Sequence, residues 1–132
     1  ETFFGGLSAL QKPNAYLEII ASSILLNAGY VLIIYETFIG LGFDQLYGLE
    51  LPASLVIMAI SSIGVIAPTP GAAGSYHFLF SQGLHRLYLV PLNAALACAT
   101  LAHAIATLTY VAIGGPALLL QWLQNRGKRE AA

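Results

Sequence analysis

The sequence predicts an all-α, polytopic integral membrane protein in which one helix pair is re-entrant or broken at residues 68–74. Of the 132 residues, 58% are hydrophobic and only 8% are charged, whereas soluble domains carry about 25% charged residues. Arg86 is the only charged residue between positions 51 and 125. The uncharged runs on its two sides each exceed the length of about 20 residues that a spanning helix needs.

The net charge of −1 gives no basic surface, so no nucleic-acid partner is expected. Cys98 lies in an alanine-rich apolar run and is expected to be a small buried hydrophobe. Residues 1–13 are interpreted as a linker or the end of an upstream element, since the chain starts without a signal-peptide pattern. We therefore expect a C-terminal portion of a longer protein, whose missing N-terminal half would complete the same membrane domain.

The first predicted helix covers residues 14–39, with Asn14 as its N-cap. Its polar residues Ser22, Ser23 and Asn27 are expected to bond to backbone or to neighbouring helices rather than to substrate. For Glu36 we favour a carboxylate at the level of the lipid headgroups over an ionisable group that faces a cavity.

Residues 40–50 are predicted to form a loop, because three of them are glycines. Helix 52–67 follows, with Pro52 in its first turn, and helix 76–87 comes after the break. The alanine-rich helix 93–113 is expected to pack tightly against its neighbours and to end at Gly114, Gly115 and Pro116. A short, interfacial helix 117–124 and a polar cytoplasmic tail 125–132 complete the expected chain.

Two topologies compete for the segments on either side of the break. They form either a re-entrant hairpin that enters and leaves on one side, or one broken spanning helix. In the hairpin topology, Lys12 and the basic tail share one side, which agrees with the preference of cytoplasmic loops for Lys and Arg. We therefore favour the hairpin.

The break itself is the first candidate site. Backbone groups that leave a helix inside lipid are tolerated only where protein buries them or where they line a wet cavity. The small residues before Tyr76 would let a ligand approach free N–H groups at the positive end of the following helix, which suits an anion such as a phosphate. The alternative is an ordinary loop outside the membrane. The candidate binding residues here are Pro68, Thr69, Pro70, Gly71, Gly74, Ser75, Tyr76 and His77.

A polar stripe on helix 93–113 is the second candidate. Thr100, His103, Thr107 and Tyr110 recur at intervals of three and four, which places them on one helical face. His103 is expected to point inward, with His77 facing it, where two histidines bind a phosphate or relay protons. Two histidines without a carboxylate or thiolate are a weak metal signature, so no metal and no cofactor are expected, and no nucleophile–base set indicates an enzyme.

The segment Pro68-Thr69-Pro70-Gly71-Ala72-Ala73-Gly74-Ser75-Tyr76-His77, with an apolar helix before it and the His103 helix after it, resembles the C-terminal part of the lysylphosphatidylglycerol synthase transmembrane-region family, a flippase-like family. The family pattern is a Pro-Gly-Gly-x-Gly break followed by Glu or His. Ala72 replaces the second glycine here, and His77 takes the position often held by Glu. The similarity in layout covers about residues 14–115, and its specific part is these ten residues.

The resemblance implies a protein of the bacterial inner membrane that translocates a phospholipid or polyprenyl-linked lipid, with membrane lipids as partners. A homo-oligomer is a further option. The absence of a synthase domain from this sequence gives no support for aminoacyl transfer. Two other functions stay open: an ion- or proton-coupled transporter of small solutes, and a membrane scaffold in which the break serves packing alone.

Overall fold

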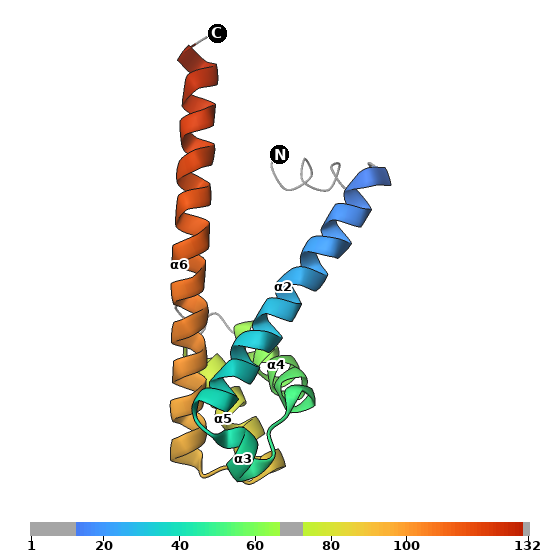
Figure 1. The fold of residues 1–132 in the computed structure, drawn as a ribbon, viewed down its shortest axis with the longest axis vertical. Helices are drawn as coiled ribbons and strands as arrows, with labels where there is room; N and C mark the ends of the chain where they lie inside the picture. Colours follow the sequence, from blue (N-terminus) through green and yellow to red (C-terminus); the bar gives the residue numbers. More distant parts are fainter. Residues whose placement is uncertain (1–12, 67–72, 131–132) are drawn as a thin grey trace.

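The computed structural model describes residues 13–66 and 73–130 (Figure 1). Every element in these ranges is a helix, so the all-α prediction is confirmed for them. The helices are α2 (Pro13–Gly40), α3 (Phe43–Tyr47), α4 (Leu51–Val65), α5 (Ala73–Tyr88) and α6 (Leu92–Glu130). Most of the predicted break, residues 67–72, lies outside the described residues.

Helices α2 and α6 carry the two segments that are long and apolar enough to cross a membrane. These segments are Tyr16–Gly40, with 25 residues, and Leu92–Leu123, with 32 residues. Only 11% and 17% of the residues in their most apolar stretches are buried inside the molecule. The two helices lie close together near α3 and diverge toward the end of the molecule where α2 begins and α6 ends (Figure 1).

Helices α4 and α5 form a close antiparallel pair between the two long helices. A Cβ atom on Gly64 would lie 2.7 Å from the carbonyl oxygen of Ser75, and one on Gly83 would lie 3.0 Å from Cδ1 of Ile57. Because the later residue of α4 meets the earlier residue of α5, the helices run in opposite directions. The start of α4 and the end of α5 therefore lie together at the α3 end of the molecule (Figure 1).

The core lies at the end where the elements converge. Its fully buried side chains include Phe38 from α2, Leu49 before α4, Phe80 from α5 and Cys98 from α6, which confirms the expected burial of Cys98. Val90, also fully buried, fixes the α5–α6 turn, since its N–H donates to the carbonyl oxygen of Leu84 at 3.3 Å.

Helix α6 differs most from the sequence prediction. It runs without interruption from Leu92 to Glu130, with Pro116 inside it, so the expected end at residues 114–116 and the separate helix 117–124 are wrong. Residues 125–130, expected in a polar tail, are its last turns. Proline removes one backbone donor, and the alanine and leucines that follow it at 117–120 favour continuing the helix past that missing bond, although Gly114 and Gly115 precede it.

The other helix bounds lie within a few residues of those predicted. Helices α2 and α4 correspond to the predictions 14–39 and 52–67, and Pro52 lies in the first turn of α4. The expected loop contains the short helix α3, flanked by Gly42 and Gly48 in the left-handed conformation. Helix α5 begins three residues earlier than predicted, at Ala73, so Ser75, which was expected ahead of the helix, lies within its first turn.

Candidate functional site

A cavity of about 650 Å³ lies among α2, α4, α5 and α6. This size falls within the range of small-molecule sites, about 300–1,000 Å³. Each of the four helices contributes to its wall. The lining residues are Asn27, Tyr30, Ile33, Ile34, Met58, Ser61, Ser62, Val65, Tyr76, Ala102, His103, Ala106, Thr107 and Tyr110.

The α6 wall is the predicted polar stripe with one exception. His103, Thr107 and Tyr110 line the cavity, together with the small side chains of Ala102 and Ala106. The small alanine side chains leave space in front of this part of the wall. The intervals of three and four place His103, Thr107 and Tyr110 on one face of α6. Thr107 donates its hydroxyl to the His103 carbonyl oxygen at 2.8 Å, which leaves the hydroxyl oxygen as an acceptor.

Thr100 does not belong to this wall. Its side chain is exposed, and its hydroxyl donates to the carbonyl oxygen of Leu96 at 2.9 Å. The residue continues the spacing of the stripe, but the first lining residue of α6 is Ala102, two positions later. Spacing along a helix defines a face and does not say where a neighbouring helix begins to cover that face.

Two aromatic contacts join α5 to α6 at the edge of the cavity. The ring centroids of His77 and His103 lie 5.0 Å apart, with 33° between the ring planes. The prediction that His77 faces His103 is confirmed by this contact. Tyr76 packs edge-on against His103, at 5.2 Å between centroids, and Tyr76 lines the cavity, whereas His77 is not one of the lining residues.

The α2 wall contains a functional candidate that the sequence prediction missed. Tyr30 packs edge-on against Tyr110 across the cavity, at 5.9 Å between ring centroids. Asn27, one turn earlier, donates its amide to the Ser23 carbonyl oxygen at 2.8 Å, as expected for backbone satisfaction. The spacing of Asn27, Tyr30 and Ile34 was the available signal, because it gives α2 one polar-edged face.

The α4 wall supplies hydroxyl groups that are bonded to their own helix. Ser61 donates to the Ile57 carbonyl oxygen at 2.7 Å. Ser62 donates to the carbonyl oxygen of Ala59 at 2.8 Å. These bonds use each hydroxyl hydrogen within α4 and leave each hydroxyl oxygen able to accept a hydrogen bond.

The break residues divide into two groups. Pro68, Thr69, Pro70 and Gly71 lie outside the described residues. Gly74 is exposed in the first turn of α5, and a Cβ atom there would meet nothing within 4 Å. Ser75 donates its hydroxyl to the carbonyl oxygen of Gly64, which makes it a packing residue between α4 and α5. The role of Ser75 in an anion cradle stays a prediction.

Glu36 is exposed and does not line the cavity, which leaves the cavity wall without a charged side chain. Within the described ranges, no group of three or more His, Cys, Asp or Glu residues comes together as a metal site would require. The wall thus combines phenol, hydroxyl, amide and imidazole groups with aliphatic side chains. Such a surface solvates a polar group through hydrogen bonds and an apolar group through packing.

Comparison with known proteins gives no match: no family model, no curated protein and no solved structure is similar to the chain at a significant level. The fold and the cavity therefore define the class of protein. This is a helical protein with two helices long and apolar enough to span a membrane and with an uncharged, polar-edged cavity between them.

Proposed function

We propose that this chain is part of a polytopic membrane protein that moves a phospholipid or polyprenyl-linked lipid between the leaflets of a bacterial inner membrane. The observation that carries the proposal is the position of the cavity. Its polar groups lie between two long apolar helices whose outer faces are exposed. A polar cavity between such faces suits a molecule with a polar head and apolar chains.

The exposed apolar side chains of α2 and α6 support insertion into a membrane. Leu25 is 76% exposed, Val111 is 66% exposed and Ile113 is 69% exposed. Burying apolar surface stabilises by about 25 cal/mol per Å², so a row of such residues along two helices strongly favours a hydrocarbon environment over water.

Helices α4 and α5 are proposed to be a re-entrant pair. They contain 15 and 16 residues, and at about 1.5 Å per residue neither reaches across a hydrocarbon core of about 30 Å. Because they run antiparallel, the start of α4 and the end of α5 lie at one membrane surface. The end of α4 and the start of α5 then lie inside the bilayer, beside the cavity.

The headgroup path is proposed to pass Tyr76, His103 and Tyr110. A site for transient passage must bind the lipid head strongly enough to admit it and weakly enough to release it. Hydrogen-bond donors on an uncharged wall meet this requirement, because a buried ion pair would hold an anionic head with much greater energy.

Proteoliposomes that contain a fluorescent phospholipid test the proposal through the rate at which probe becomes accessible to a membrane-impermeant quencher. We expect His103→Ala and Tyr76→Phe to slow translocation about tenfold, since a hydrogen bond to a charged group is worth about 1.5–3 kcal/mol. Thr100→Ala is the matched control, because Thr100 lies on the same helix outside the cavity. Unchanged rates in both cavity variants would contradict lipid translocation.

Proton-coupled transport of a small solute is the second candidate function, and the contact between His77 and His103 favours it. Two neighbouring imidazoles form a short path for a proton near neutral pH. Solute uptake that follows a pH gradient and does not depend on lipid composition would support this function. Full tolerance of substitutions at Tyr76, His77 and His103 would instead support a scaffold.

A further inference from the structure

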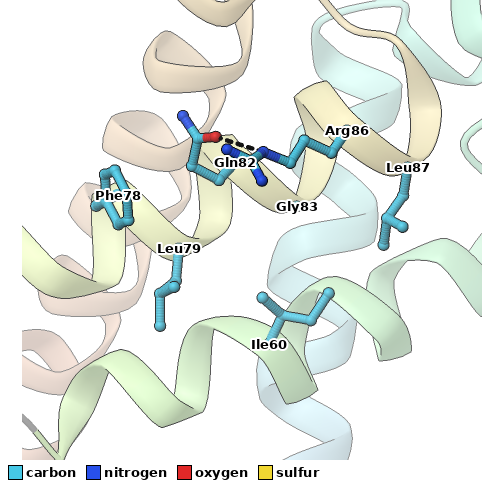
Figure 2. A pocket seen from close by; sticks show the side chains of 7 residues that line it. All are labelled: Ile60, Phe78, Leu79, Gln82, Gly83, Arg86 and Leu87. Atoms are coloured by element: carbon cyan, nitrogen blue, oxygen red, sulfur yellow. Dashed lines mark hydrogen bonds between the residues drawn. The ribbon is translucent and has the colours of Figure 1, made fainter.

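A second hollow, of about 380 Å³, lies on α4 and α5 away from the central cavity (Figure 2). No residue lines both. One wall comes from Ile60 of α4, and the rest comes from one face of α5. The residues of α5 that line it are Phe78, Leu79, Gln82, Gly83, Arg86 and Leu87. We refer to these residues, with Ile60, as the Arg86 groove.

The groove is apolar along most of its length. Gly83 forms its floor, where the missing side chain lets Ile57 and Ile60 of α4 approach the backbone of α5. Phe78 is 60% exposed and Leu87 is 55% exposed, so large apolar side chains stand at both ends with no protein covering them. The shape suits an extended apolar chain.

One cation lies in this apolar setting. Arg86 is the only Lys or Arg between positions 13 and 125. Its Nε donates to Oε1 of Gln82 at 2.9 Å, which draws the side chain back along α5 over the groove (Figure 2). No carboxylate in residues 13–66 or 73–130 makes an ion pair with it. The terminal guanidinium nitrogens and the Gln82 amide nitrogen are further hydrogen-bond donors at this groove.

We propose that the Arg86 groove binds a phospholipid with an anionic phosphodiester headgroup. The guanidinium and the Gln82 amide donate to the phosphate oxygens, in the forked geometry that Arg offers such anions. An acyl chain lies against Phe78, Leu79 and Ile60. The site needs the membrane insertion argued above, but not lipid translocation, since it shares no residue with the cavity.

The position of Arg86 in the fold agrees with this ligand. It lies near the end of α5, at the end of the molecule where α2 ends and α6 begins (Figure 1). If α2 and α6 span the bilayer, this end is at a membrane surface, where phosphate groups reside and long basic side chains extend toward them. A charged residue among exposed leucines is stable at that depth and costly deeper in the hydrocarbon.

Titration of the purified protein in mild detergent with dioleoyl-phosphatidylglycerol tests the proposal, read out by native mass spectrometry and by the rise in thermal midpoint. Dioleoyl-phosphatidylcholine serves as the zwitterionic comparison. We expect the anionic lipid to bind preferentially, and Arg86→Gln to weaken that binding about tenfold, as loss of a charged hydrogen bond of about 1.5 kcal/mol implies. Arg86→Lys should retain part of the preference.

Arg126→Gln is the charge-matched control, because Arg126 lies over Trp122 near the far end of α6. Equal losses of binding in both arginine variants, or equal binding of both lipids, would overturn the site.

Phe78→Ala, which keeps the cation, should also weaken lipid binding. Full stabilisation by glycerol 3-phosphate alone would overturn the lipid assignment. Arg86→Gln should weaken lipid binding and leave the translocation rate unchanged. A failure of the lipid site and a failure of the proposed translocation would therefore give different results.

Discussion

The hydroxyl of Ser75 in α5 donates a hydrogen bond to the carbonyl oxygen of Gly64 in α4, and the two residues lie in close backbone contact. Gly64 has no side chain, which lets the backbone of α5 lie directly against α4 at this level. The contact fixes the spacing of the pair beside the cavity. It also aligns Tyr76, the next residue of α5, with His103 of α6.

Replacing Gly64 by alanine should therefore destabilise the protein. The new Cβ would lie 2.7 Å from the Ser75 carbonyl oxygen and 2.9 Å from the Tyr76 nitrogen, and both are backbone atoms that cannot rotate away. Overpacking of this kind costs about 1–3 kcal/mol. Thermal unfolding in detergent should show a lower midpoint for Gly64→Ala.

Gly29→Ala is the matched control for that change. Gly29 is also inside a helix, but its Cβ would meet nothing within 4 Å. Alanine should be neutral there or stabilise by up to about 1 kcal/mol. An equal loss of stability in both variants would show that the Gly64 contact is not the cause.

Ala106→Phe should block translocation and leave the fold intact. Ala106 lines the central cavity on the same face as His103, and the volume of about 650 Å³ accepts a phenyl ring. Ala104→Phe is the control, since Ala104 is exposed on another face of α6. Translocation in proteoliposomes should be lost in the first variant only. Normal transport by Ala106→Phe would exclude the cavity as the path.

Leu89→Gly should stabilise the turn between α5 and α6. Leu89 has a φ of 57°, a left-handed conformation that costs an L-residue about 1–2 kcal/mol. It is 81% exposed, so little packing is lost, and the larger entropy of glycine in the unfolded chain offsets only about 0.4–1 kcal/mol. The midpoint of thermal unfolding should rise for Leu89→Gly but not for Leu89→Ala, which keeps the strained geometry.

The continuity of α6 across Pro116 is testable by spin labels. With Cys98 replaced by serine, labels at positions 108 and 123, both exposed, flank the proline. An unbroken helix places the two Cα atoms about 22 Å apart, from a rise of about 1.5 Å per residue. Electron–electron double resonance should give one narrow distribution near that distance. A broad or much shorter distribution would indicate that the helix ends at residues 114–116.

Several features of the site were predictable from residue types and spacing. His103, Thr107 and Tyr110 repeat every three or four residues on an otherwise apolar helix, so their shared face followed from helical periodicity. The contact between His77 and His103 was expected for the same reason. Tyr30 was missed because its spacing with Asn27 and Ile34 marks one face of α2 but does not say which neighbouring helix that face meets.

The helical class, the location of most helices and the two segments apolar enough to span a membrane could be predicted from the residues alone, because these depend on composition and on periodicity within one stretch of chain. Which part of each helix face is covered became known from the packed fold. It placed Thr100 outside the cavity and Tyr30 inside it, carried α6 through Pro116, and made Ser75 a packing residue against Gly64. Each of these outcomes depends on contacts between segments distant in sequence or on the balance of many helical residues against one proline, and a local pattern does not contain that information.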